Sequence, residues 1–403
     1  MSLTSQIRDG NSPVRQFFKK FENNEGRREC LKLLQSSIPP RPPQLVNAPA
    51  VVYAFVGTAS DYLIRYSAGG NSLVFDNTIA HQALEVEFCD KRCLNDLFAI
   101  GQRNLDGRVA TDANAVYSAT ALATLDNVYR TSGRLPELFS SLNVRYRYKQ
   151  LKEHGLGDLQ DRAIKAIHKP LWLEAKLQRM LFTHRKQRKL VQSIQHRLIQ
   201  PKPTPRVALN KKQMEVLGLE IASGSAVRFL VDAELVLKRI GNKVEDCPTE
   251  SLFQTYYKTL GGDSYTQDVS NIVATFLRAV KDPDSELYNA RLVVPNRALA
   301  NSWLVGGADF DFVVECKGRM ILTDIKTTKR PLVTEHIRQL IGYALLYDET
   351  KDDFTFSDVG IYHSRSGSIR SLPLDSVIRK YLPSFKSISQ AREQFISEIA
   401  TAE

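Results

Sequence analysis

The chain has 403 residues, of which 43% are hydrophobic and 25% are charged, and this balance excludes fibrous and largely disordered proteins. It carries 55 Lys and Arg against 44 Asp and Glu, so the net charge is +11 and the isoelectric point is near 9.3. A basic chain favours polyanionic partners such as nucleic acid or an anionic membrane surface. The length predicts either one large core with a sizeable insertion or two domains.

The apolar segments of the chain are short. No run reaches the length of about 18 residues typical of a membrane-spanning helix, and the first residues are polar and charged rather than signal-like. The five cysteines are odd in number and scattered, as is typical of free thiols in a reducing compartment. We therefore expect a cytoplasmic protein with no membrane partner and no disulfide bonds.

Residues 1–49 are predicted to form a short N-terminal helix followed by a proline-rich linker. Ser12 and Pro13 are typical of the N-cap and the first position of a helix, and four prolines follow within residues 39–43. Residues 50–77 are predicted to be the first part of the core. In this part an apolar run precedes Gly57, where we expect a turn into a helix.

Residues 78–289 are predicted to be a mostly helical insertion, because apolar residues recur at spacings of three and four. Its clearest predicted helices cover residues 83–101 and 112–130. Residues 160–200 are conspicuously basic, and both a phosphate-backbone contact and a solvated helix face explain such a charge run. The candidate nucleic-acid-binding residues are Arg179, Arg185, Lys186, Arg188, Lys189 and Arg197.

In residues 290–403 the apolar pattern changes from helical to extended, which predicts a core of alternating strands and helices. The predicted strands cover residues 291–295, 302–315 and 319–328. The last two are expected to form a hairpin through Cys316-Lys317-Gly318. A helix over residues 335–347 and a second hairpin turning at Ser366-Gly367 complete this α/β unit.

The hairpin carries the most specific chemistry in the chain. Asp324 and Lys326 are two residues apart, so a strand places both side chains on one face while Ile325 points into the core. An antiparallel hairpin is expected to bring Asp309 beside Asp324. Two carboxylates at one point suit a hard cation such as Mg²⁺, and Lys326 could stabilise the charge that develops on a phosphate or activate the attacking water.

An Asp and a Lys on one strand face also form ordinary solvated ion pairs, and this explanation is the commoner one for the D-x-K pattern alone. Here Asp324 follows Met-Ile-Leu and Lys326 follows Ile325, so the two charges stand within an apolar strand. Burying them without compensation would cost several kcal/mol, roughly. A cation or another charged partner is therefore expected.

Three ordered motifs resemble those of RecB-like PD-(D/E)xK nucleases: G-x-x-D from Gly306 to Asp309, D-x-K from Asp324 to Lys326, and Q-x-x-x-Y from Gln339 to Tyr343. The resemblance covers residues 290–375 and, loosely, 50–66. It implies a restriction-endonuclease-like core, in which helices flank a central mixed sheet. It also implies that Asp309, Asp324 and the Ile325 carbonyl bind a metal, that Lys326 assists catalysis, and that Gln339 and Tyr343 lie beside the site.

Two positions of this pattern leave alternatives open. The family's first motif resembles G-T-x-x-H, and Asp61 stands here at the place of the histidine, where it could be a metal ligand or a helix N-terminal charge. Asp311 competes with Asp309, because both lie on the same strand face, and the G-x-x-D register favours Asp309. No cysteine follows Cys316, so we expect no iron–sulfur cluster.

The expected function is therefore hydrolysis of DNA phosphodiester bonds with Mg²⁺ or Mn²⁺, in recombination, repair or anti-phage defence. A G-x-x-x-x-G-K-S/T phosphate loop is absent from the sequence, so a helicase or ATPase activity would come from a separate subunit. The alternatives are an inactive nucleic-acid-binding or scaffold protein on a nuclease fold, and a nuclease directed at RNA.

Overall fold

The computed structural model describes residues 3–36, 50–69, 92–103, 110–132, 262–328 and 330–402, with isolated positions at 38, 78, 105, 250, 253, 254, 257, 258 and 260. The proline-rich stretch and the six basic residues from Arg179 to Arg197 lie outside these residues. Within the described part of the chain, no helix has the length and apolar character needed to cross a membrane.

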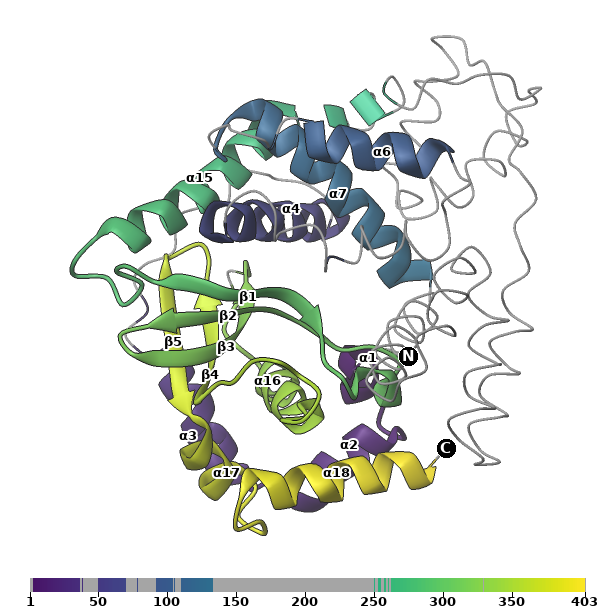
Figure 1. Cartoon of the computed structure of the whole chain (residues 1–403), viewed down its shortest axis with the longest axis vertical. Helices are drawn as coiled ribbons and strands as arrows, with labels where there is room; N and C mark the ends of the chain where they lie inside the picture. The colour runs from purple at the N-terminus through teal and green to yellow at the C-terminus, as the bar shows by residue number, and fades with distance from the viewer. Residues whose placement is uncertain are drawn as a thin grey trace, which may run out of the picture.

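A five-stranded mixed sheet forms the centre of the fold (Figure 1). Its strands are β1 (Arg291–Ala298), β2 (Asp309–Cys316), β3 (Arg319–Lys326), β4 (Asp358–His363) and β5 (Ser368–Pro373), in that order across the sheet. β3 and β4 run parallel, and the other neighbours run antiparallel. The predicted α/β character is confirmed.

Both predicted hairpins are confirmed. Lys317 and Gly318 join β2 to β3 with φ of 50° and 72°, the left-handed pair that suits the twist of a tight hairpin. Gly367, with φ of 68°, lies in the turn between β4 and β5. The predicted single strand over residues 302–315 is wrong, because Gly306 and Gly307 have positive φ and separate the short helix η3 (Ser302–Val305) from β2.

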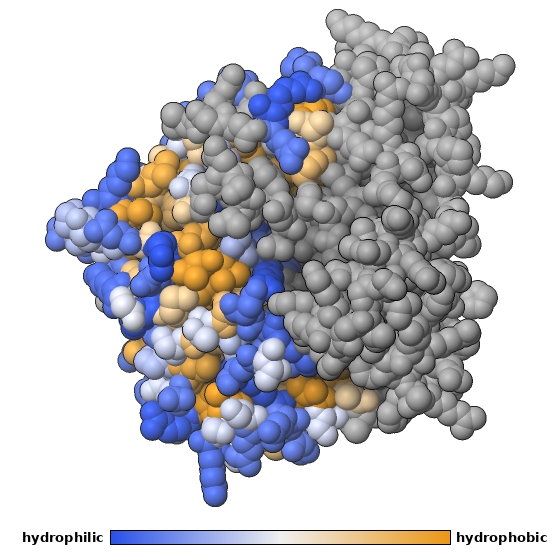
Figure 2. Space-filling model, in the orientation of Figure 1, coloured by the Kyte–Doolittle hydropathy of each residue, from blue (hydrophilic) through white to orange (hydrophobic). Residues whose placement is uncertain are grey.

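One face of the sheet is covered by a helical layer, which Figure 1 shows above the strands. It contains α4 (Ala50–Gly69), α6 (Arg92–Arg103), α7 (Ala113–Ser132) and α15 (Gly262–Lys281). The expected turn at Gly57 is wrong, since α4 runs through this residue and the Thr58 hydroxyl donates to the Ala54 carbonyl. Within the predicted helical insertion, α6, α7 and α15 are helical, whereas residues 282–289 form turns that lead into β1. Figure 2 shows hydrophobic residues at the surface where α4 and α15 meet the sheet.

The opposite face is covered by helices from both ends of the chain. They are α1 (Leu3–Arg8), α2 (Pro13–Phe21), α3 (Asn24–Gln35), α16 (Thr334–Leu346), α17 (Leu374–Tyr381) and α18 (Ile388–Ala402). Ser12 caps α2 as predicted, by accepting a hydrogen bond from the Arg15 N–H. Phe17 and Phe18 are fully buried against Phe395 of α18, so residues 3–36 share one core with the C-terminal unit.

Candidate active site

Asp324 and Lys326 stand at the end of β3, where the sheet meets α16. The Lys326 Nζ lies 2.5 Å from the Asp324 Oδ2, and the two side chains are 17% and 5% exposed. Ile325, between them, packs into the core on the other side of the sheet. The structure therefore places the two charges on one face and the apolar residue on the other, as the alternation of β3 predicts.

A chain of hydrogen bonds runs from Lys326 into α16. Lys326 Nζ donates to Gln339 Oε1 at 3.1 Å, and Gln339 Nε2 donates to the Tyr343 hydroxyl at 2.5 Å. Gln339 and Tyr343 are four residues apart, so one face of the helix presents both. The Q-x-x-x-Y motif thus contacts the D-x-K motif directly, and Gln339 orients the ammonium group.

Asp311 lies closer to Asp324 in the sheet register than Asp309 does. The register between β2 and β3 runs as far as Phe312↔Thr323, and one further pair would place Asp311 level with Asp324. The Asp311 carboxylate accepts a hydrogen bond from the Ile325 N–H, within the D-x-K motif. Asp309 begins β2 two residues earlier, and its carboxylate interacts electrostatically with Tyr343.

Asp61 reaches the same region from α4. Its carboxylate forms an ion pair with Arg65, one helical turn later, and interacts electrostatically with Asp311. Gly57 of the same helix faces Thr327, which directly follows Lys326. The loosely matching G-T-x-x-D segment therefore lies against the end of β3, next to the two stronger motifs.

The carboxylates of Asp61 and Asp324 repel that of Asp311 when all three are ionised. Burial raises the pKa of Asp311 well above its usual range, and the charges of Asp61 and Asp324 raise it further against the opposing effect of Arg65. Burial alone would lower the pKa of Arg65, but Asp61 and Asp311 raise it overall. Burial and the nearby Asp324 carboxylate also raise the pKa of Tyr343, which therefore keeps its proton.

Two residues of this region were not identified from the sequence. In the sequence, only the presence of Asp61 four residues earlier points to Arg65, and pairs with this spacing are common on helices. His336, in the first turn of α16, lies near enough to Lys326 to interact with it electrostatically. Burial and then Lys326 lower the pKa of His336 to about 4, so its imidazole is neutral at pH 7.

The donor set fits a hard divalent cation in its chemistry, because Asp61, Asp309, Asp311, Asp324 and the Ile325 carbonyl offer only oxygen atoms. Among the residues that the structure describes, however, no three His, Cys, Asp or Glu side chains lie close enough together to hold a metal ion. Two of the carboxylates instead pair with cations of the protein, Asp61 with Arg65 and Asp324 with Lys326. A metal would have to replace part of this pairing.

A buried ion pair supports the end of β3 from the helical layer. Arg365, in the loop after β4, makes two hydrogen bonds to Asp268 of α15, at 2.9 and 2.7 Å. Its Nε also donates to the Thr327 carbonyl at 2.9 Å. Arg365 therefore links α15 to the residue that follows Lys326, and acts on the site only through the main chain.

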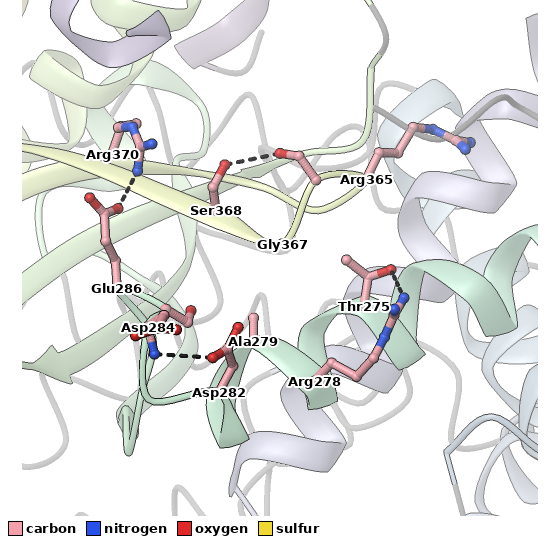
Figure 3. A pocket seen from close by; sticks show the side chains of 12 residues that line it. Thr275, Arg278, Ala279, Asp282, Asp284, Glu286, Arg365, Gly367, Ser368 and Arg370 are labelled. Atoms are coloured by element: carbon pink, nitrogen blue, oxygen red, sulfur yellow. Dashed lines mark hydrogen bonds and ion pairs between the residues drawn. The ribbon is translucent and has the colours of Figure 1, made fainter. Parts of the chain in front are cut away.

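A cavity of about 620 Å³ lies between the end of α15 and the β4–β5 turn (Figure 3). It contains none of the motif residues. Its lining brings together basic and acidic side chains, and Arg370 pairs with Glu286 across it. The opposite charges offset each other, so the cavity has no evident preference for an anionic ligand.

Comparisons with known proteins gave no match to this chain among protein-family models, curated proteins or solved structures. The candidate site therefore depends on the geometry of its residues and on the motif pattern alone.

Proposed function

We propose that this protein is a Mg²⁺- or Mn²⁺-dependent nuclease that hydrolyses DNA phosphodiester bonds on a restriction-endonuclease-like core of the PD-(D/E)xK type. The observation that carries the proposal is the convergence of four sequence segments on the end of β3. Asp61, Asp311, the pair Asp324–Lys326 and the pair Gln339–Tyr343 come from different elements and interact with one another. Groups that only stabilise a surface seldom gather in this way.

The metal ligands in this proposal are Asp309, Asp324 and the Ile325 carbonyl, with Asp61 and Asp311 as further carboxylates around the ion. A bound divalent ion would supply a nucleophilic water and neutralise charge on the phosphate. Lys326, which Gln339 orients, stabilises the negative charge that develops on the phosphoryl oxygens. Tyr343 keeps its proton and holds the Gln339 amide in place.

The second candidate function is a nucleic-acid-binding or scaffold protein whose nuclease core has no activity. The observation that favours it is the pairing of Asp61 with Arg65 and of Asp324 with Lys326, without three ligating groups together in the described part of the chain. Such a protein would keep the fold and the positive charge and would bind no divalent ion at this site.

The proposed setting is cytoplasmic, with DNA as substrate and a separate helicase or ATPase subunit as the candidate protein partner. Recombination, repair and anti-phage defence are the processes that suit such an enzyme. The six basic residues between Arg179 and Arg197 remain the candidates for contact with the phosphate backbone, which would make DNA binding sensitive to salt.

The test is digestion of linear DNA, closed circular DNA and RNA in parallel, with Mg²⁺, with Mn²⁺ and with EDTA. Cleavage of DNA that requires the metal supports the proposal, and attack on closed circles identifies an endonuclease. Preferential cleavage of RNA would replace DNA by RNA as the substrate. Metal-independent binding of nucleic acid without cleavage would support the scaffold function instead.

A further inference from the structure

Arg65 is among the most deeply buried large side chains of the protein, although it carries a permanent charge. It is 1% exposed, and its guanidinium lies 5.0 Å from the centre of the Tyr62 ring. The carboxylate of Asp61 pairs with it, and that of Asp311 interacts with it electrostatically. A buried positive charge therefore lies beside Asp61 and Asp311, which together with Asp324 form the acidic cluster of the candidate site.

The hydrogen bonds of Arg65 leave part of its buried guanidinium unsatisfied, so stability alone does not explain why an arginine is buried here. Its Nη1 is buried and has no hydrogen-bond partner among the described residues. Buried polar groups placed only for stability are normally satisfied, and an unsatisfied one costs free energy. The guanidinium is held by hydrogen bonds to the carboxylate and the carbonyl oxygen of Asp61, by the Tyr62 ring and by the negative charge of Asp311.

Arg65 is also badly placed to touch a substrate. Its side chain is 1% exposed, whereas the paired Asp61 side chain is 14% exposed. A phosphate group of a polymer has no access to so deeply buried a guanidinium. Any functional role of Arg65 would therefore be exerted on the carboxylates of the acidic cluster and not on the substrate.

We propose that Arg65 is the resident counter-ion of the acidic cluster, which a divalent cation must outcompete for Asp61 and Asp311 when it binds. This inference rests on the proposed metal-dependent function and adds a residue that sets the affinity for the metal. In the metal-free protein Arg65 offsets carboxylate repulsion and allows the site to fold. The same positive charge repels the incoming metal ion, so Arg65 keeps metal affinity low.

The experiment compares wild type with Arg65→Met, measuring Mn²⁺ affinity by titration calorimetry and melting temperature with and without Mn²⁺. Arg65→Met should bind Mn²⁺ roughly tenfold or more tightly, because a repulsive charge has been removed. It should melt below wild type without metal and recover more with Mn²⁺ than wild type does. Equal or weaker binding by the folded variant would overturn the proposal.

Arg392→Met is the matched control. Arg392 is a buried arginine that pairs with Glu349 and lies 4.7 Å from the Tyr347 ring centre, away from the acidic cluster. Its loss should lower the melting temperature without changing Mn²⁺ affinity. Tighter Mn²⁺ binding by this variant too would show a general effect of lost charge and contradict a specific role for Arg65.

A variant that removes one charge of each sign covers the case in which Arg65→Met does not fold. The double variant Arg65→Met/Asp311→Asn should melt above Arg65→Met alone without metal, since it removes the repulsion that Arg65 offsets. A double variant no more stable than the single one would overturn the counter-ion role. If neither wild type nor Arg65→Met binds Mn²⁺, the metal-dependent function fails as well; if wild type binds it and cleaves no DNA, only the nuclease proposal fails.

Discussion

The ammonium nitrogen of Lys326 lies 2.5 Å from a carboxylate oxygen of Asp324, its neighbour two positions earlier on β3. The two opposite charges attract each other in a largely buried place, where the side chains are 17% and 5% exposed. Lys326→Met should therefore lower the free energy of unfolding by about 2 kcal/mol, because it leaves a buried carboxylate without its counter-ion. Urea unfolding measures this change.

Lys326→Met/Asp324→Leu should recover most of that loss, since it removes both charges together. The control is Lys20→Met, which breaks an exposed pair with Glu398 and should change the free energy of unfolding by less than about 1 kcal/mol. Equal losses in the two single variants would show that the Lys326–Asp324 pair contributes no more than a surface pair.

Tyr343→Phe tests the hydrogen-bond chain from α16 to Lys326. The variant removes the acceptor of the Gln339 amide and should cost about 1 kcal/mol of stability. Because Lys326 would then be less well oriented, the variant should cleave DNA roughly three- to tenfold more slowly than wild type. Rates are compared with those of Tyr288→Phe, at an exposed tyrosine. An unchanged rate in Tyr343→Phe would exclude a positioning role for the chain.

His336 should make stability sensitive to acid. Its pKa falls from 6.5 to about 4 in the folded protein, so the unfolded chain binds a proton first as the pH drops. The contribution of neutral His336 to the free energy of unfolding is present in full above about pH 6.5, and about 2 kcal/mol of it is lost by pH 5. Urea unfolding at pH 7.5 and pH 5 should show a smaller acid loss in His336→Asn than in wild type. Parallel losses in the two proteins would contradict the assignment.

Arg365→Met should destabilise the protein by about 3 kcal/mol, because it leaves the buried Asp268 carboxylate uncompensated and frees the Thr327 carbonyl. Arg365→Met/Asp268→Leu should restore a large part of this free energy. Thermal unfolding of the three proteins gives the coupling between the two residues. Additive losses in the double variant would show that the pair does not act as one unit.

Gly26→Ala tests whether the N-terminal helices belong to the core. A Cβ at this position of α3 would stand 1.8 Å from the Lys380 carbonyl oxygen of α17, so the two helices would have to separate. We expect a loss of at least about 2 kcal/mol of stability. Gly10→Ala, with nothing within 4 Å of the added carbon, should be nearly neutral. A neutral Gly26→Ala would show that α3 is loosely attached.

The strands, hairpins and α16 could be predicted because their signals are local. Alternation in residues 319–326 places Asp324 and Lys326 on one face whatever the rest of the chain does. Lys317-Gly318 provides the left-handed pair that a tight hairpin requires. In α16 the spacing of four was enough to place Gln339 and Tyr343 together.

The predictions were wrong where contacts between distant parts of the chain determine the local structure. The apolar residues before Gly306 suggested a strand, but the main chain there is held by α1, through a hydrogen bond from the Leu3 N–H to Gly307 and one from Gln6 to Val305. Gly57 suggested a turn, but buried residues such as Phe55 and Tyr62 keep α4 helical on both sides of it.

The details of the site depend on register and burial, which one sequence does not contain. Asp309 and Asp311 share a strand face in the sequence pattern, and the hydrogen bond from the Ile325 N–H to the Asp311 carboxylate shows which of the two contacts the D-x-K motif. Asp61 and Arg65 at a spacing of four are typical of an exposed helix surface. The role that we propose for them rests on the burial of Arg65.

In the function that we propose, Asp324 and Lys326 form the active centre of a metal-dependent nuclease. Cleavage of DNA with Mg²⁺ by wild type, Asp324→Asn and Lys326→Gln tests it most directly, with Asp353→Asn as the exposed control and unfolding curves to show that each variant is folded. We predict that both site variants lose at least about a hundredfold in rate while the control keeps wild-type activity. Undiminished cleavage by a folded Asp324→Asn or Lys326→Gln variant would exclude this pair as the active centre.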